Sequence, residues 1–283
     1  MTRVVCAGHV NWDVTLRVEA LPEADGETQV KSHRRAGGGS AANVSAALAG
    51  LGHDPLVVGS VGDDDFGPLV RQELEGAGVD CTHLQQVAGE TTVKYLIVDA
   101  DAEVHVLASD GVNEAFGPED VPEPTLAGAG VLHLTGQRPG TAKRLAERAR
   151  GTETLVSVDP GRRVGQREFG PVFEGADIIF LNEREAAAVE SGESTQTVVK
   201  KGGDGATVEW DGQRAHHDGF DVGPVDTAGA GDAFAAGFLS ALLDGMAPGD
   251  ALAVGNACGA LASSSVGART GISWPDVEAV LGG

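Results

Sequence analysis

Cysteine, aromatic side chains and positive charge are all scarce in this chain of 283 residues. Its three cysteines, Cys6, Cys81 and Cys258, are far apart, and no CxxC motif or His/Cys cluster accompanies them. This spacing argues against a disulfide framework and against a zinc site. The opening run RVVCAGHV is too short and too uncharged for a signal peptide, and no apolar run reaches transmembrane length. We therefore expect a cytoplasmic protein.

The charge balance is strongly acidic, with 20 Lys+Arg against 42 Asp+Glu and a formal net charge of -22. Such a surface repels nucleic acid and anionic membranes, so neither is an expected partner. With 41% hydrophobic residues arranged in regular runs, the chain should fold rather than remain disordered. We interpret the acidic excess as adaptation to a high-salt cytosol. A very acidic protein from a cytosol of ordinary salt is the alternative.

Short apolar runs alternate with alanine-rich segments along the chain. The expected strands are RVVCAGHV, DPLVVGSVG, GVLHLTG, TLVSVDPG, ADIIFLN and STQTVVKKG. The expected helices are SAANVSAALAGLG, FGPLVRQELEGAGV, TAKRLAERARG, AGDAFAAGFLSALLDG and PGDALAVGNACGALASSSVG. Buried strands that alternate with helices indicate an α/β protein with a doubly wound, mostly parallel sheet flanked by helices.

Two segments break this alternation. Residues 14–36 and 89–109 alternate apolar and polar side chains with no helix between them. This pattern is typical of antiparallel hairpins with one solvated face. We expect residues 1–13, 37–88 and 110–283 to form the α/β core, and the two hairpins to form a small β-sheet lid.

The stretch VDTAGAGDAFAAGFL joins the tail of a strand to a small-residue turn and a helix. Gly229, Ala230 and Gly231 leave room for a ligand to approach the main chain, and their N–H groups should lie at a helix N-terminus, which favours an anion. Asp232 falls in the first helical turn. A simple helix cap would explain a lone aspartate there. Beside an anion site, however, the same carboxylate could serve as the base for an attacking hydroxyl.

The motifs together resemble those of the PfkB family of ribokinase-like carbohydrate kinases. DTAGAGDAFAAGFL is similar to the C-terminal signature of that family, and GGGSAANVSAALAGLG to its N-terminal glycine motif. GHVNWD, GSVGDDDFG and NEREAA resemble shorter family motifs in the same order. The resemblance covers nearly the whole chain. It implies a ribokinase-like fold with a β lid and ATP-dependent phosphorylation of a hydroxymethyl group.

The resemblance also implies roles for single residues. Asp232 matches the catalytic base, and the preceding turn matches the anion hole over the γ-phosphate, formed by Gly229, Ala230 and Gly231. Sugar-binding residues are implied at the end of the first strand and in the glycine motif, at Asn11, Asp13, Gly38, Gly39 and Asn43. Further matches imply a nucleotide and cation site. The residues implied for ATP are Lys201, Gly203, Gly205, Asn256 and Asn182. Asn182 is also implied, with Glu185, to hold Mg²⁺ through water. Asp226 and Ala228 match a K⁺ site found in some members.

The acceptor is predicted from where the rare positive charge gathers. Basic residues lie before the glycine motif, after GVLHLTG and after TLVSVDPG, at Lys31, His33, Arg34, Arg35, Arg138, Arg162 and Arg163, with Gln137 beside them. Because ligands bind at the carboxyl ends of parallel strands, we expect these groups to converge there. Surface salt bridges are the alternative explanation. Neighbouring strand residues point to opposite faces, so either Arg34 or Arg35 should face the cleft and reach a phosphate on the acceptor. The other arginine should point to solvent or pair with a carboxylate.

The basic groups predict an anionic acceptor, and we prefer ribose 1-phosphate. GHVNWD resembles the opening of archaeal nucleoside kinases, which suggests a furanose substituted at its anomeric carbon. A phosphate at that carbon in place of a base would account for the arginines. The product would be ribose 1,5-bisphosphate. The open alternatives are a nucleoside kinase with Trp12 or Phe116 against the base, a ribokinase, a fructose-phosphate kinase, a 2-keto-3-deoxygluconate kinase, and a non-catalytic pseudo-kinase. A homodimer through the lid is expected. The choice between ATP and ADP as donor stays open.

Overall fold

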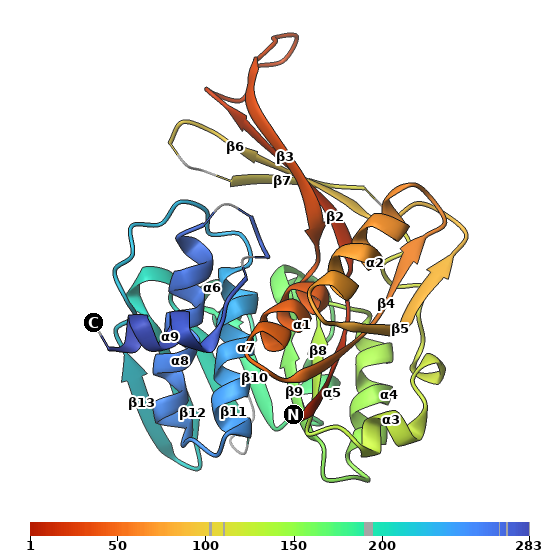
Figure 1. The fold of residues 1–283 in the computed structure, drawn as a ribbon, viewed down its shortest axis with the longest axis vertical. Helices are drawn as coiled ribbons and strands as arrows, with labels where there is room; N and C mark the ends of the chain where they lie inside the picture. Colours follow the sequence, from red (N-terminus) through yellow and green to blue (C-terminus); the bar gives the residue numbers. More distant parts are fainter. Residues whose placement is uncertain (102–103, 110, 190–194, 266, 270, 283) are drawn as a thin grey trace.

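The computed structural model describes residues 1–101, 104–109, 111–189, 195–265, 267–269 and 271–282. Within them, a nine-stranded sheet crosses the larger part of the molecule (Figure 1). Its strands, in spatial order, are β13 (Gln213–His217), β12 (Ala206–Trp210), β11 (Gln196–Lys200), β10 (Ile178–Asn182), β9 (Leu155–Asp159), β8 (Val131–Thr135), β1 (Arg3–Ala7), β4 (Asp54–Gly62) and β5 (Asp80–Val87). The strands from β11 to β5 are parallel, whereas β12 and β13 form an antiparallel hairpin at one edge.

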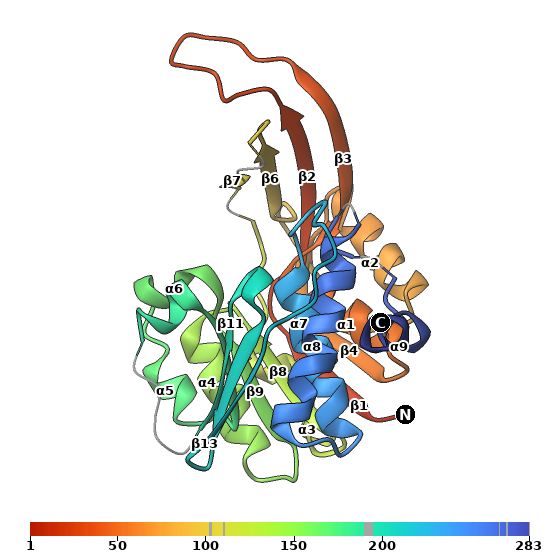
Figure 2. The ribbon, with the colours of Figure 1, turned by 90° about the vertical axis from the view of Figure 1, so that its left-hand side faces the viewer.

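Helices cover both faces of this sheet. They are α1 (Ser40–Gly50), α2 (Phe66–Gly76), α3 (Glu123–Ala127), α4 (Pro139–Ala149), α5 (Gly170–Phe173), α6 (Glu183–Ala186), α7 (Ala230–Leu243), α8 (Pro248–Ser263) and α9 (Trp274–Leu281), with 3₁₀ turns at Pro118–Asp120, Gly161–Gln166 and Gly202–Asp204. Figure 2 shows α7 and α8 on one side and α4 and α5 on the other. The predicted doubly wound α/β architecture is confirmed.

The strand period of two divides the apolar side chains between two cores. On β1, Val4 and Cys6 enter the core under α1, α7 and α8, whereas Val5 and Ala7 enter the core under α3 and α4. Helices α7 and α8 approach each other closely because the contact is built from small residues. A Cβ atom at Gly237 would lie 2.6 Å from the Cys258 sulfur.

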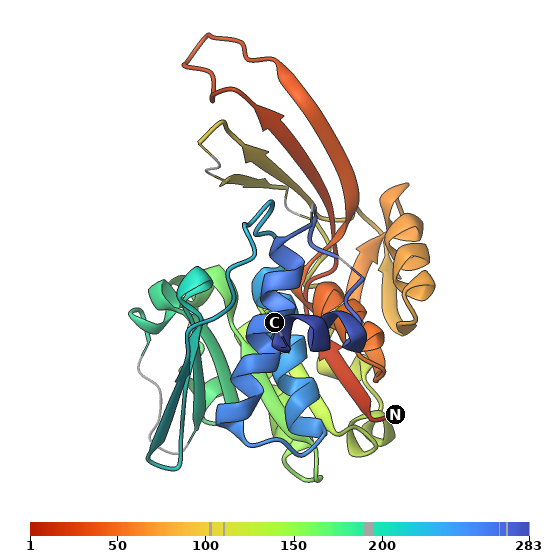
Figure 3. The same cartoon turned by 60° about the vertical axis from the view of Figure 1, so that its left-hand side comes forward.

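A separate four-stranded sheet, the small sheet, projects from this body (Figures 1 and 3). Its order is β3 (Val30–Gly38), β2 (Asn11–Val18), β6 (Val93–Val98) and β7 (Val104–Ala108). Each outer pair is antiparallel, and the central pair, β2 and β6, is parallel. The two predicted hairpins therefore pair side by side into one sheet.

Three details differ from the sequence predictions. Strand β5 was not predicted, because it carries many polar residues. The edge hairpin of β12 and β13 was not predicted either. Asn11 and Asp13 do not end the first strand, since β1 stops at Ala7 and both residues begin β2. None of the helices among the described residues is both long and apolar enough to cross a membrane.

Candidate active site

The carboxyl ends of three adjacent parallel strands supply charged and polar side chains at one edge of the large sheet. Asp159 is the last residue of β9, Asn182 of β10 and Lys200 of β11. The register pairs Asn182 directly with Lys200. Ligands of open parallel sheets bind at this edge, so these residues locate the candidate site.

Asp232 lies in the first turn of α7 and is held from another helix. Asn43 of α1 donates a hydrogen bond from Nδ2 to Asp232 Oδ2 at 2.8 Å. Burial raises the pKa of Asp232 to about 6, although the Asn43 hydrogen bond opposes the shift. A carboxylate with this pKa is ionised at neutral pH and still accepts a proton readily, as a general base requires.

The turn before Asp232 has the backbone geometry that its glycines suggested. Gly229 has a φ of 77°, in the left-handed region, and a side chain there would collide with the Ala268 carbonyl oxygen. At Gly231 a Cβ atom would lie 3.4 Å from Lys200 Nζ. The start of α7 thus offers backbone donors beside an ammonium group, although the Ala230 N–H already donates to the Thr227 carbonyl at 3.3 Å. That combination favours a bound anion.

Lys200 and Asp159 were missed by the sequence predictions. Lys200 Nζ pairs with Asp159 Oδ2 at 2.6 Å, and both side chains are mostly buried. Burial alone would lower the pKa of Lys200, but Asp159 outweighs it and raises the pKa. The neighbouring Lys201, predicted as an ATP ligand, is partly exposed, and its backbone N–H donates to the Gly205 carbonyl at 2.8 Å.

Asn182 and Glu185 form a reciprocal capping box at the start of α6. The Glu185 N–H donates to Asn182 Oδ1 at 2.9 Å, and the Asn182 N–H donates to Glu185 Oε2 at 2.9 Å. Burial, followed by the charge of Asp159, raises the pKa of Glu185. A cation beside Glu185 would offset the repulsion that Asp159 exerts on its carboxylate.

The residues predicted to bind the sugar come together at the junction of the small sheet and α1. Asn11 is fully buried and accepts a hydrogen bond from Asn113, while its own Nδ2 has no described partner. Asp13 has an unpartnered Oδ1, and burial raises its pKa while Lys94 opposes this. Gly38 lies against the Asp13 carboxylate, where a side chain would collide with it. These unpartnered atoms are free to bind hydroxyl groups.

Arg269 was also missed. It donates from Nη2 to the Gly38 carbonyl at 3.0 Å and from Nε to Asn43 Oδ1 at 3.3 Å. It also pairs with Glu73 at 3.5 Å. The side chain therefore fixes both the glycine motif and the residue that holds Asp232. Gly39, at a φ of 96°, turns the chain from β3 into α1.

A pocket of about 450 Å³ opens between the small sheet and the carboxyl edge of the large sheet. We call it the basic pocket, because four of its lining side chains are cationic: Lys94, Arg138, Arg163 and Arg167. Lys94 comes from β6, and the arginines follow β8 and β9. Two predicted arginines, Arg138 and Arg163, are thus brought together, whereas Lys94 and Arg167 were not predicted.

Glu114 sits among these cations with His9. Its carboxylate binds Arg167 at 2.6 Å, His9 at 3.1 Å and Arg138 at 3.4 Å. Burial opposes ionisation of Glu114, but hydrogen bonds from His9 and Arg167 outweigh it and hold the pKa at about 2. Gln137 does not line the pocket; it is buried and donates to the Ala7 carbonyl at 3.2 Å.

The basic cluster on β3 does not line this pocket, and its convergence with the other two basic groupings stays a prediction. Lys31 pairs with Glu19 at the far end of the small sheet. The register places Arg34 opposite Thr15 and Arg35 opposite Val14. Because Asp13 and Thr15 share one face, Arg34 lies on the face of the small sheet that carries Asp13, and its guanidinium lies against Gly267. Arg35 is on the other face.

The residues predicted near the nucleotide lie around β12, β13 and α8. Gly205 has a φ of 76°, and a side chain there would collide with the His217 carbonyl. Asn256 of α8 donates to that carbonyl at 3.4 Å. Gly203 is exposed in the adjoining turn. Their contact with ATP stays a prediction.

The predicted cation residues Asp226 and Ala228 precede that turn. Asp226 accepts the Ala228 N–H at 3.0 Å and the Gly267 N–H at 2.9 Å, one on each carboxylate oxygen. Among the residues that the structure describes, no group of three or more His, Cys, Asp or Glu side chains is arranged to hold a metal ion. A K⁺ site at Asp226 would therefore depend on backbone oxygens as well.

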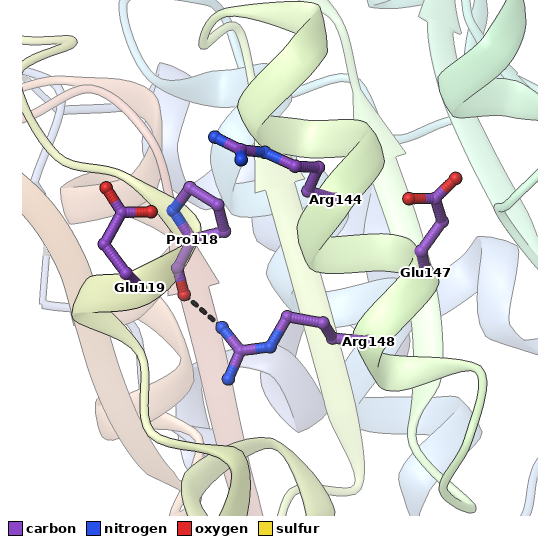
Figure 4. A pocket seen from close by; sticks show the side chains of 5 residues that line it. All are labelled: Pro118, Glu119, Arg144, Glu147 and Arg148. Atoms are coloured by element: carbon purple, nitrogen blue, oxygen red, sulfur yellow. Dashed lines mark hydrogen bonds between the residues drawn. The ribbon is translucent and has the colours of Figure 1, made fainter.

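Both aromatic side chains considered for base stacking are core residues. Trp12 stacks on Phe66 with ring centroids 5.4 Å apart, and Trp12 and Phe116 are buried. The nucleoside alternative thus loses its proposed stacking partners. A second hollow, in Figure 4, lies away from the site between α4 and the 3₁₀ turn Pro118–Asp120, where Arg148 donates to the Pro118 carbonyl. Its lining offers Arg144 and Arg148 together with Glu119 and Glu147, so it has no single charge preference.

Together the sheet edge, the helix start with its carboxylate and the neighbouring basic pocket define a phosphotransferase that acts on an alcohol group. A model of the pfkB carbohydrate kinases matches residues 1–275. The chain belongs to the pfkB family of carbohydrate kinases.

Relatives agree in sequence and in fold. The chain is 52% identical over 290 residues to the ATP-dependent ribose-1-phosphate kinase of Halopiger xanaduensis, covering 99% of this chain and 97% of the relative. It is 29% identical to the nucleoside kinase of Methanothermobacter thermautotrophicus, covering 86% and 83%. The ribokinase structure from Thermotoga maritima superposes with a TM-score of 0.88 at 24% identity, covering 100% of both chains, which confirms the ribokinase-like fold.

Proposed function

We propose that this kinase transfers the γ-phosphoryl group of ATP to the hydroxymethyl group of a ribose-like furanose that already carries a phosphate, with ribose 1-phosphate as the acceptor. The observation that carries the proposal is the basic pocket beside Asp13 and Asp232. The 52% identical relative, whose name states the same acceptor and donor, supports it. In a chain with a net charge of -22, a pocket lined by four cations favours an anionic ligand.

In the proposed reaction, Asp232 accepts the proton of the acceptor hydroxyl. The hydroxyl oxygen then bonds to the γ-phosphorus as the bond from that phosphorus to the bridging oxygen breaks, and ADP leaves. Backbone N–H groups at Gly229 to Gly231 and the ammonium group of Lys200 stabilise the charge on the transferred group. Asn43 holds Asp232 in place, and Asp13 and Asn11 hold the sugar hydroxyls.

A magnesium ion fits the proposal through Asn182 and Glu185. The capping box occupies Asn182 Oδ1 and Glu185 Oε2, which leaves Glu185 Oε1 for a water of the ion. Mg²⁺ keeps most of its waters and binds through few carboxylates, so a water-mediated arrangement suits these two side chains. The ion would neutralise charge on the phosphates of ATP. A K⁺ ion near Asp226 and Ala228 is a further proposal.

We also propose that residues 14–36 and 89–109 act as a lid and that two lids pair in a homodimer. The face of the small sheet opposite Asp13 exposes apolar side chains, with Tyr95 at 41% and Leu107 at 59% exposure. They are neighbours in the register. A second copy would cover this face. Sedimentation analysis should give a dimer, and Leu107→Glu should shift it to monomer; a monomeric wild-type protein would refute the pairing.

A phosphorylation screen in high KCl tests the acceptor directly. Ribose, ribose 1-phosphate, fructose phosphates, nucleosides and 2-keto-3-deoxygluconate would be compared by ADP release, and the products by mass spectrometry. Ribose 1-phosphate should give the highest kcat/KM and a bisphosphate product. Preference for a neutral nucleoside over every phosphorylated sugar would refute the proposal, and absence of ADP release with all acceptors would support a pseudo-kinase.

A further inference from the structure

The four cations of the basic pocket are not equivalent, because the Glu114 carboxylate forms ion pairs with two of them, Arg138 and Arg167. Arg167 makes a two-pronged contact with Glu114, at 2.6 Å and 3.3 Å. Arg138 approaches the same carboxylate at 3.4 Å, with a side chain that is 67% exposed. A guanidinium engaged in this way gains less from a second anion, because its charge is already compensated.

Lys94 and Arg163 are left without such a partner. Across the described parts of the chain, no carboxylate lies within ion-pair distance of either side chain. Lys94 is only partly exposed, and burial lowers its pKa. For Lys94, burial disfavours the charge, and the carboxylates of Asp13 and Asp232 offset this only in part, so a ligand anion would stabilise it further. Arg163 is exposed and is open to a ligand for that reason.

The position of Lys94 connects this cation to the sugar. In the parallel pairing of β2 and β6, Lys94 lies directly beside Asp13, and in the pairing of β6 and β7 it lies opposite Ala108. All three therefore share the face of the small sheet that lines the basic pocket. An acceptor whose hydroxyls bind Asp13 would place a substituent of the same ring within reach of Lys94. Arg163 approaches from the other side, in the turn after β9.

We propose that Lys94 and Arg163 bind the phosphate of the acceptor. Arg138 and Arg167 pair with Glu114 instead and line the wall of the pocket. This assignment rests on the proposed function and names the residues that choose a phosphorylated over a neutral furanose. It changes the sequence-based expectation, in which Arg34 or Arg35 reached this phosphate and Arg138 and Arg163 were further substrate-binding residues. Because Lys94 belongs to the small sheet and Arg163 to the large one, the bound phosphate would also link the two sheets.

The test compares two acceptors that differ only in the phosphate. The ratio of kcat/KM for ribose 1-phosphate to kcat/KM for ribose would be measured for the wild type, Lys94→Met, Arg163→Gln, Arg138→Gln and the control Arg144→Gln. Arg144 lies in the second hollow on α4, away from the site. Any general damage to the site cancels in the ratio, and turnover of ribose reports that each variant is folded.

Lys94→Met and Arg163→Gln should each lower the ratio about tenfold to a hundredfold, the scale of a lost charged hydrogen bond. Lys94→Arg should restore most of it. Arg138→Gln should lower the ratio by less than either, and Arg144→Gln should leave it at the wild-type value. A loss at Arg138 equal to that at Lys94 would overturn the assignment, as would an unchanged ratio in both Lys94→Met and Arg163→Gln.

The two levels of the proposal fail in different ways. A wild-type ratio at or below one would refute the proposed acceptor itself. A high wild-type ratio that survives in the Lys94 and Arg163 variants would leave the acceptor standing and refute only these residues. If Lys94→Met does not fold, Lys94→Gln and the Arg163 variant decide the question by the same ratio.

Discussion

The acidic limb of the pH profile should belong to Asp232 and should move when Asn43 is removed. The wild-type pKa of Asp232 is raised to about 6, chiefly by burial, and the Asn43 hydrogen bond at 2.8 Å holds it below the value that burial alone would give. The base must be ionised to act, so kcat/KM for the acceptor should fall as pH drops below about 6. At pH 5 about a tenth of the plateau should remain.

Asn43→Ala removes a hydrogen bond to a charged group, which is worth about 1.5–3 kcal/mol. Since one pKa unit corresponds to about 1.4 kcal/mol, the midpoint of the limb should move upward by about one to two units. Asn43 also lies near the proposed sugar site, so the height of the plateau will fall as well. The midpoint is therefore the informative quantity, because it does not depend on that height.

The matched control is Ser45→Ala on the same helix. Ser45 is buried and donates to the Ala41 carbonyl at 2.7 Å, without contact to Asp232. This variant should lose some stability and keep the wild-type midpoint. A midpoint near 6 in Asn43→Ala would show that the hydrogen bond does not tune the base. An acidic limb that persists in Asp232→Asn would show that another group is the base.

Four further outcomes are expected. Asp232→Asn should lower kcat by about a hundredfold or more, and a loss below about threefold would reject the base assignment. The same variant should have a higher melting temperature than the wild type at pH 8 but not near pH 3. A carboxyl group whose pKa is raised in the folded state stabilises the fold below its pKa in the unfolded chain, and this stability is lost as the pH rises through about 6. The asparagine carries no charge at either pH and avoids that loss. Lys200→Met should lower both kcat and stability, because it leaves the buried Asp159 carboxylate unpaired. The double variant Lys200→Met, Asp159→Asn should regain stability but not kcat. Recovery of both would mean that the role of Lys200 is purely structural. Lowering KCl from molar to dilute concentration should reduce activity and melting temperature, because the repulsion between carboxylates at a net charge of -22 is then unscreened. An unchanged melting temperature would reject salt adaptation. Higher activity in KCl than in NaCl at equal ionic strength would indicate a K⁺ site near Asp226.

The parts of the site that are local in sequence were predictable. The turn from Gly229 to Asp232 was recognised because its small residues, its helix start and its carboxylate are adjacent in the chain. The order of strands and helices followed in the same way from runs of apolar residues. Each of these features depends on a few neighbouring residues, and the period of two or 3.6 identifies it directly.

The parts that depend on non-local pairing were missed. Lys94 appears in the sequence as one polar residue of an alternating strand, and only the parallel pairing of β2 with β6 places it beside Asp13. Lys200 and Lys201 are adjacent, and the choice between them depends on where β11 ends and which face it presents. Arg269 joins the glycine motif from a loop more than two hundred residues away in the chain. Local pattern contains no information on any of these contacts.

The scarcity of positive charge drew attention to two kinds of basic residue: Arg138 and Arg163, which the basic pocket brings together, and the cluster on β3, which lies outside it. On β3, the basic residues that stand out in the sequence are exposed, and Lys31 is paired with Glu19. An exposed pair of this kind is screened and contributes little. In the basic pocket, the low exposure of Lys94 and the neighbouring Asp13 make each charge interact more strongly with its surroundings. Burial and pairing therefore decide which of the few cations in an acidic protein is available to a ligand, and both arise only once the strands have been paired.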